Sequence, residues 1–448
     1  METGAVVAAL LDSEARGLLS RLNQIKPFVM HETMVQAAAL PTDAQLIIER
    51  FLHAGREQLR TKVSEFLRWL HGPGRSAPAA QQQKRFVLVR LEFNVVLTQF
   101  DLFTEVVTQR SEAETGIWLS GLDVLADDAL RVDVEGTREA RAVCYLARGA
   151  GAAIRRANTR LPGGKPNPVA IIRIPRERMI GSGIASSLCH EVGHQGAAQL
   201  DLVTSLRVDI RRAARTESGG HWLVFDRWIS EIIADMWSVG KLGLTSTVGL
   251  LAVVSLPKFF VFRDSGDDPH PTPYLRVLIS SAVGEALYPH PQWQIMRSTW
   301  KQMYPIDVLP SARRTRIENT EAAIGRLVDL LVHHRAPALK GRELGSIWPL
   351  KERRPENLGR LHQEWGDDVA VMARQSPSLV FAVIGQAKAT GAISPEAENA
   401  LLTRLLTIWA VRSSLDAVHR VNTPHQPSNT PPDPGRQNSH GVKNGDHR

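Results

Sequence analysis

The segment His190-Glu-Val-Gly-His194 sets two imidazoles four residues apart, with a carboxylate directly after the first. Residues at this spacing share one face of an α-helix, so both imidazoles can reach a single metal ion if the segment is helical. Zinc would lower the pKa of a bound water to about 7, and Glu191 could take a proton from that water. The segment therefore predicts a helix that carries a catalytic zinc site, although five residues alone are a short signal and the surroundings must decide.

The residues before this segment predict a strand, a glycine turn and then the helix. Residues 168–175 form a β-branched run bracketed by prolines, which is typical of a strand at the edge of a sheet. Gly181-Ser-Gly183 follows, and we expect the helix over about 184–203.

A catalytic zinc ion usually has three protein ligands, so a third ligand is needed. Position 200, six residues after His194, is a leucine, and Asp201 would lie about 10 Å further along the same helix. The best candidate is Glu231, within the apolar segment 228–237 that predicts a second helix.

Asp235 follows Glu231 by four residues and shares its helix face. Its carboxylate could accept the outer N–H of a zinc-bound histidine and so fix the orientation of that ring. Two carboxylates in an otherwise apolar helix are costly to bury without a cation. The alternative is an ordinary solvent-facing pair.

A third block of interest is the proline-stiffened segment 267–276, which contains His270 and Arg276. Both side chains can carry positive charge and are suited to stabilising an oxyanion or holding a substrate carbonyl. The alternative is a surface turn with an incidental histidine.

These three blocks, in this order, resemble the gluzincin metallopeptidases. His270-Pro271 with Arg276 is similar to a segment of the CaaX prenyl protease and heat-shock membrane metalloprotease family. The resemblance covers about residues 169–276 and implies zinc ligands at His190, His194 and Glu231, a general base at Glu191, a supporting carboxylate at Asp235, and substrate-facing roles for His270 and Arg276. That family carries transmembrane helices, whereas the longest uncharged apolar stretch here, 242–257, is shorter than the roughly 20 residues of a bilayer span and predicts a buried helix.

In gluzincins an edge strand lies along the cleft and pairs with the substrate. By resemblance, the strand over 169–174 could do this, with Val169 and Ile171 contacting the substrate. Tyr274 could donate to the oxyanion, although a packed tyrosine is the stronger alternative. The strand could also simply complete a small sheet.

Periodicity and composition divide the chain into a zincin-like core within a larger helical body, so we expect an α+β protein that is predominantly helical. We expect a helical region over 1–72, a linker over 73–83 and a second helical region over 84–140, with a further helix over about 138–158. The metallopeptidase core would span 141–310, a C-terminal helical region 311–420, and a disordered tail 421–448.

The formal net charge is +8, and the arginines that supply most of it are scattered in short clusters, several of them flanked by acids. We therefore expect a solvated basic surface and no nucleic-acid partner; nucleic-acid binding would instead fall steeply with salt. Only two cysteines, Cys144 and Cys189, are present, which indicates a reducing compartment. The N-terminus lacks the pattern of a secretion signal, so a cytoplasmic location is expected.

The leading hypothesis is a soluble zinc metallopeptidase that hydrolyses a peptide or protein substrate with Glu191 as general base. The alternative is a non-catalytic, zinc-binding helical scaffold that binds a partner. An intact Glu191 argues against the alternative, because a purely structural zinc site needs no base. The sequence does not indicate an oligomeric state.

Overall fold

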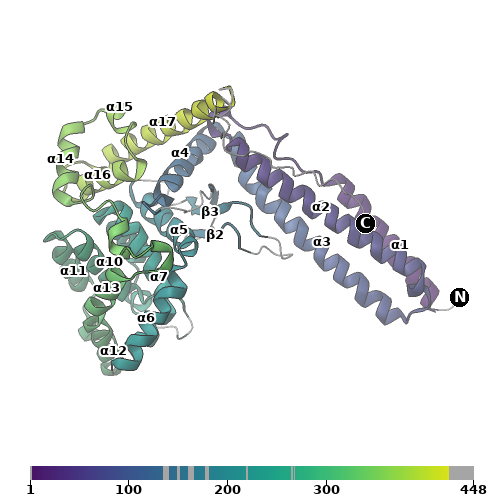
Figure 1. Cartoon of the computed structure of the whole chain (residues 1–448), viewed down its shortest axis with the longest axis horizontal. Coiled ribbons are helices and arrows are strands. Elements are labelled where there is room, and N and C mark those ends of the chain that lie inside the picture. The colour runs from purple at the N-terminus through teal and green to yellow at the C-terminus, as the bar shows by residue number, and fades with distance from the viewer. Residues whose placement is uncertain are drawn as a thin grey trace, which may run out of the picture.

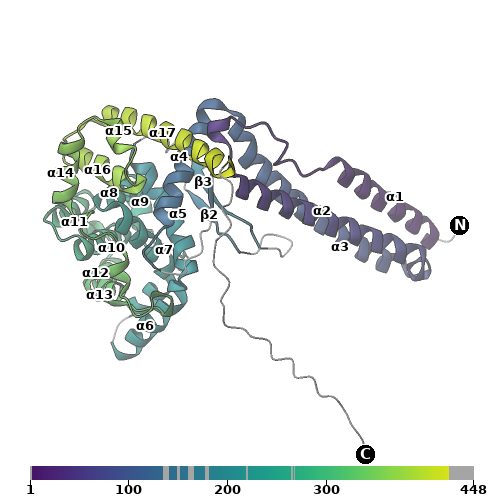
Figure 2. The same ribbon diagram turned by 45° about the horizontal axis from the view of Figure 1, so that its top comes forward.

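The computed structural model describes residues 3–134, 141–148, 152–159, 166–176, 181–217, 220–263, 266 and 268–422. Within them, a long helical arm projects from a larger helical body, and a three-stranded sheet lies where the two meet (Figure 1). A second view shows the C-terminal helix running across the body toward the base of the arm (Figure 2). The predicted class, α+β with a predominance of helix, is confirmed.

Three helices form the arm: α1 (Thr3–Gln24), α2 (Thr42–His71) and α3 (Ala79–Thr108). Their inward-facing residues make an apolar core of their own. In α2 the buried positions recur every three or four residues, the repeat of one helix face. These positions include Ile48, Leu52, Leu59, Val63, Phe66 and Leu70. The long helices that periodicity predicts in these regions are confirmed.

The linker predicted over 73–83 is wrong in its second half. Pro73–Ser76 forms one 3-10 turn, and α3 already begins at Ala79. Gln82 is fully buried and donates a hydrogen bond to the carbonyl of Gly74. Alanine and glutamine favour helix, so the segment whose composition suggested a linker instead forms the first turn of α3.

The sheet consists of β1 (Ala142–Ala147), β2 (Ala153–Arg155) and β3 (Ala170–Pro175), in the order β1-β3-β2. β1 runs parallel to β3, and β2 runs antiparallel to it. The helix expected over 138–158 is therefore wrong for the described part of that segment. A short apolar run does not separate strand from helix by periodicity alone, and the distant pairing with β3 decides the outcome.

The two faces of the sheet belong to two different cores, because successive side chains of a strand point to opposite faces. The residues in the body core are Ala142, Cys144, Leu146, Ala170, Ile172 and Ile174. Those in the arm core are Val143, Tyr145, Val169 and Ile171. The sheet is therefore the layer through which the arm and the body are joined.

β3 is the middle strand, which corrects the prediction of an edge strand. It pairs with β1 along its whole length and with β2 from Ile171 to Arg173. The flanking prolines lie before the strand and at its last residue, so they do not interrupt the pairing. Val169 and Ile171 are 1% and 0% exposed and face the arm, so the prediction that they contact a substrate is wrong.

Side chains close the outer edge of β1. Gln109 accepts a hydrogen bond from the N–H of Leu146 and donates one to its carbonyl, both at 2.8 Å. Asp123 accepts from the N–H of Cys144 at 2.7 Å, and Arg110 donates to the Cys144 carbonyl at 2.6 Å. β2, the other outer strand of the described sheet, is half-buried to exposed.

The remaining helices build the body. They are α4 (Ala113–Leu130), α5 (Gly183–Gln199), α6 (Leu202–Thr216), α7 (His221–Leu242), α8 (Leu244–Val254), α9 (Lys258–Val261), α10 (Pro273–Leu287), α11 (Gln292–Met303), α12 (Ser311–Ala322), α13 (Ile324–His333), α14 (Pro355–Trp365), α15 (Val369–Met372), α16 (Pro377–Ala389) and α17 (Pro395–Asn422). The helix predicted within 242–257 is confirmed as α8. None of the helices in the described ranges is both long and apolar enough to cross a membrane. The predicted tail lies outside the described residues from position 423 onward.

Candidate metal centre

Two glycines let helices α5 and α7 approach closely. A Cβ atom at Gly193 would lie 2.9 Å from the Cα of Ala234 and 2.8 Å from the Cβ of Trp237. At Gly196 it would lie only 2.2 Å from Cη2 of Trp237. Close-packed interiors do not absorb such overlaps without movement, so the absence of these side chains sets the distance between the two helices.

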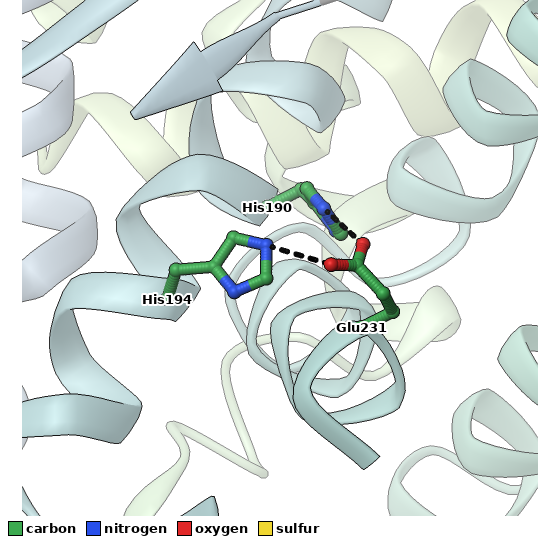
Figure 3. A group of neighbouring side chains, drawn as sticks. All are labelled: His190, His194 and Glu231. Atoms are coloured by element: carbon green, nitrogen blue, oxygen red, sulfur yellow. Dashed lines mark ion pairs between the residues drawn. The ribbon is translucent and has the colours of Figure 1, made fainter. Parts of the chain in front are cut away.

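The three predicted ligands meet where α5 and α7 touch (Figure 3). Nε2 of His190 lies 3.3 Å from Oε2 of Glu231, and Nε2 of His194 lies 3.5 Å from Oε1 of Glu231. One potential ligand atom from each residue lies within 4.8 Å of the others. Among the described residues, no second group of three histidines, cysteines or acids is gathered in this way.

These three residues could hold one metal ion, and their donor atoms are of the kinds that zinc binds. Zinc binds imidazole nitrogens and carboxylate oxygens at about 2.0–2.2 Å, which places neighbouring ligand atoms roughly 3.4 Å apart. The carboxylate of Glu231 is buried, and a buried carboxylate needs positive charge beside it. In the metal-free protein His190 and Arg276 supply that charge, and a metal ion bound to the three residues would supply it in their place. The residues present therefore suit the ion that the sequence predicts.

Asp235 and Arg276 form a chain of contacts behind His190. Nδ1 of His190 lies 2.8 Å from Oδ1 of Asp235, so a proton on Nδ1 is donated there and Nε2 remains free for a metal. Arg276 binds the same carboxylate twice, from Nε to Oδ2 at 2.6 Å and from Nη2 to Oδ1 at 2.8 Å. Arg276 is therefore first of all a positioning residue that acts through Asp235.

The burial and the neighbouring charges of the three candidate ligands shift their pKa values. Burial by itself lowers the pKa of His190, but Asp235 and Glu231 outweigh it and raise that pKa to about 9. Burial raises the pKa of Glu231, but His190 and the other nearby cationic groups lower it to about 2. Burial and the neighbouring His190 lower the pKa of His194 to about 4. Of the two imidazoles, His190 is therefore the one that holds an extra proton near neutral pH in the metal-free protein, and a cation that binds its Nε2 must displace that proton.

Glu191 is buried beside the ligands, with 7% of its surface exposed. Burial raises the pKa of its carboxyl group, and the positive charges of His190, Arg276 and His270 act in the opposite direction. A carboxylate with a raised pKa is a better proton acceptor near neutral pH. The side chain predicted as the general base thus lies within the electrostatic field of this centre.

His270 lies at the exposed side of the centre. Its Nε2 is 3.6 Å from Oε2 of Glu231, and its side chain is 53% exposed. Asp268 holds it by accepting hydrogen bonds from the His270 backbone N–H at 3.0 Å and, at 2.8 Å, from Nδ1. Asp268 was not predicted, although an aspartate two residues before the group it binds is a recognisable turn signal.

Tyr274 does not reach the centre, so its predicted substrate contact is wrong. Its side chain is buried, and its ring packs 5.2 Å from that of Phe262. Burial raises the pKa of its hydroxyl, and the charges that add to this effect are Glu321 and Asp307, not the metal centre. Arg276 lies two positions after Tyr274, so the two side chains point to nearly opposite sides of α10.

Two further residues that position α5 were not predicted. Gln195 accepts a hydrogen bond at 2.9 Å from the N–H of Ala157, which ties α5 to the end of β2. Glu398 of α17 is 1% exposed and accepts from the N–H of Ser182 at 3.0 Å, directly before α5 begins. Both contacts join segments far apart in sequence, so no local pattern signals them.

A Ser–His–Asp chain lies elsewhere in the body. His334 contacts Ser205 through Nε2 at 2.9 Å and Asp209 through Nδ1 at 2.8 Å. Ser205, however, lies inside α6, and its hydroxyl also donates to the carbonyl of Asp201 at 2.9 Å. This hydrogen-bonded chain ties the end of α13 to α6.

Comparison of the chain with protein-family models, curated proteins and solved structures finds no match. The interpretation of the centre therefore depends on its own residues. Their geometry provides two imidazoles and a carboxylate for one cation, a buried carboxylate beside them, and the side chains of His270 and Arg276 within 4 Å of Glu231.

Proposed function

We propose that this chain is a zinc-dependent peptidase of the gluzincin type. His190, His194 and Glu231 would hold the ion, which when bound polarises the peptide carbonyl and lowers the pKa of water. The observation that carries the proposal is that the two oxygens of the buried Glu231 carboxylate face the Nε2 atoms of His190 and His194 at 3.3 and 3.5 Å, with Glu191 next to His190 on α5. Two buried free cysteines favour a cytoplasmic setting.

The remaining residues supply the proton transfer and the positioning. Glu191 accepts a proton from the attacking water and returns it to the leaving amine nitrogen, which conserves protons over the reaction. Asp235, held by Arg276, keeps Nε2 of His190 directed at the ion. His270, fixed by Asp268, faces the same centre from the solvent side and is suited to stabilising the developing oxyanion.

The outer strand β2 replaces β3 as the proposed support for an extended peptide. β1 is closed by side chains and β3 is paired on both sides, which leaves β2 as the described edge available for strand addition. The hydrogen bond between Gln195 and Ala157 joins the end of β2 to the metal-carrying helix. A peptide paired there would run beside α5.

The first test is the zinc content of the purified chain, compared with His190→Ala and Glu231→Ala. We expect about one zinc per chain in the wild type and little in either variant, because removing one of three ligands weakens a zinc site strongly. His333→Ala, which changes an exposed histidine of α13, should retain full zinc. A chain prepared without chelators that binds no zinc would refute the proposal.

The second test separates a peptidase from a zinc scaffold. Fluorescein-labelled casein should be cleaved by the zinc-loaded wild type, and Glu191→Gln should reduce cleavage by at least a hundredfold while keeping its zinc. Full cleavage by Glu191→Gln would exclude the mechanism. Zinc binding without cleavage of casein or of a mixed peptide library would favour the scaffold.

A further inference from the structure

A cavity of about 290 Å³ lies at the base of the arm, where the arm, the body and the C-terminal helix meet (Figures 1 and 2). Its walls come from residues 36–45 up to the start of α2, from α4, from residues 141–143 at the start of β1, and from the C-terminal half of α17. The described residues that line it include none of the metal centre. Its volume is close to the lower end of the range for small-molecule sites, roughly 300–1,000 Å³.

Polar contacts between distant segments hold the walls of this cavity together. The hydroxyl of Ser414 in α17 donates to the carbonyl of Gln36 at 2.9 Å, which joins the C-terminal helix to the chain before α2. Arg141 donates to Asp43 of α2 at 3.1 Å and to Asp127 of α4 at 3.0 Å, which joins the arm to the body. The cavity is therefore preorganised, and a ligand would not have to assemble its walls.

A buried hydroxyl without a partner lines the cavity. Ser120 of α4 is 7% exposed, and its hydroxyl makes no hydrogen bond to any residue that the structure describes. Serines inside helices commonly donate to the carbonyl four residues earlier, as Ser281 does at 2.9 Å. Since a buried hydroxyl without a partner costs free energy, a ligand that bonds to Ser120 would be favoured. The hydroxyls of Thr42 and Ser413, which line the same cavity, also have no partner among the described residues.

The two carboxylates in the wall are already paired with arginines. Asp123 lies 2.9 Å from the buried Arg110, and Asp127 lies 3.0 Å from Arg141. Asp43, the second partner of Arg141, is 53% exposed and hydrated. Burial and the neighbouring Asp123 nevertheless raise the pKa of Asp127 to about 6, although Arg141 acts in the opposite direction. The ionised Asp127 would therefore be stabilised by further hydrogen-bond donors, whereas the wall carries no unpaired charge that would favour an ion.

We propose that this cavity binds a small neutral polyol, such as a monosaccharide or a cyclitol. Each hydroxyl group of a polyol can both donate and accept, so it can donate to the wall carboxylates and bond to the hydroxyl of Ser120. The C–H surfaces of the same molecule suit the apolar part of the wall, which includes Leu40 and Val124. A bound polyol would contact the arm, the body and α17 at once, and its binding requires neither zinc nor peptidase activity.

The test is isothermal titration of the full-length protein with three polyols, myo-inositol, glucose and sorbitol. Cyclohexanol, cyclohexylamine and cyclohexanecarboxylate serve as ring-sized controls that carry one hydroxyl, a positive charge and a negative charge. Ser120→Ala removes the unpartnered hydroxyl, and Ser413→Ala removes a second one from the opposite wall. The matched control is Ser281→Ala, which removes a fully buried serine hydroxyl of α10 away from the cavity. Thermal melting verifies that each variant is folded.

We expect at least one of the three polyols to bind the wild type with a Kd of about 1 mM or lower, a common strength for a small ligand with few contacts. Ser120→Ala should weaken that binding about fivefold through the loss of one hydrogen bond, and Ser281→Ala should leave it unchanged. Hydrogen exchange of the wild type should slow on polyol binding at the start of α2 and in the C-terminal half of α17, but not in α12.

Four results would overturn the inference. The first is that none of the three polyols binds with a Kd below about 10 mM. The second is that cyclohexanol binds as tightly as the best polyol, which would indicate an apolar cavity. The third is tighter binding of cyclohexylamine that is lost in Asp127→Asn, which would indicate a cation site. The fourth is polyol binding of equal affinity in the wild type, Ser120→Ala and Ser413→Ala, which would place the bound polyol elsewhere on the molecule.

Discussion

At the scale of single residues, the two imidazoles of the centre differ in how strongly they hold a proton. Asp235 and Glu231 raise the pKa of His190 to about 9, whereas burial and the neighbouring His190 lower that of His194 to about 4. Metal binding needs both imidazoles neutral at Nε2. The same carboxylates that attract a cation therefore also retain a competing proton.

Zinc affinity should consequently rise with pH. Between about pH 5.5 and 7.5 His190 is protonated and His194 is neutral in the metal-free protein, so each zinc displaces one proton. We expect the apparent Kd to fall about tenfold per pH unit over this range. Calorimetry in buffers of different ionisation enthalpy should show about one proton released per zinc; a Kd independent of pH would contradict this protonation scheme.

Removing the charge of Asp235 tests its positioning role. Asp235→Asn keeps the shape of the side chain but weakens its hold on His190 and on Arg276. We expect zinc affinity at pH 8 to fall about tenfold to a hundredfold, the usual effect of losing such a supporting carboxylate. Competition with a chromophoric chelator measures it, with the exposed Asp329→Asn as the control. If the zinc affinity of Asp235→Asn equalled that of the wild type, the Asp235 carboxylate would have no part in positioning His190 for the metal.

At the scale of elements, the contact between α5 and α7 is what makes a site out of two separate sequence patterns. Gly196→Ala would place a methyl group 2.2 Å from the Trp237 ring. We expect a loss of stability of about 1–3 kcal/mol from overpacking, together with weaker zinc binding as the helices separate. Gly183→Ala, at the start of the same helix with open space around it, is the matched control and should preserve both. Thermal melting and zinc titration measure the stability and the zinc affinity of both variants. If Gly196→Ala and Gly183→Ala gave the same values, Gly196 would not set the distance between α5 and α7.

At this scale the sequence predicts well those features that depend on residues close together in the chain. Helical spacing predicts that His190 and His194 share a face, and that Glu231 and Asp235 share another, and the structure brings those faces together. What it misses depends on distant contacts. Tyr274 was assigned to the site because it stands near Arg276 in sequence, but the turn of the helix directs it away. The prolines that bracket residues 168–175 predict an edge strand, but they lie before β3 and at its last residue, and pairing with the distant β1 and β2 makes β3 the middle strand.

At the scale of the whole molecule, one thin sheet connects two cores. Ile171 is buried on the arm side, whereas its neighbour Ile172 is buried on the body side. Ile171→Ala should cost about 2–5 kcal/mol and should loosen the arm more than the metal centre. Hydrogen exchange should show faster exchange in α2 and α3, with zinc content retained. Ile172→Ala provides the comparison, and the same exchange pattern in both variants would contradict the division into two cores.

The closed edge of β1 also limits how molecules of this chain can join one another. Exposed strand edges are where sheets polymerise, and along the outer edge of β1 the side chains of Gln109, after α3, and Asp123, in α4, bond to the backbone instead. Fibre-like growth from the described sheet would have to begin at β2, beside α5. An added strand at that edge would lie close to the point where Gln195 joins the end of β2 to α5, so self-association would begin at the helix that carries His190 and His194.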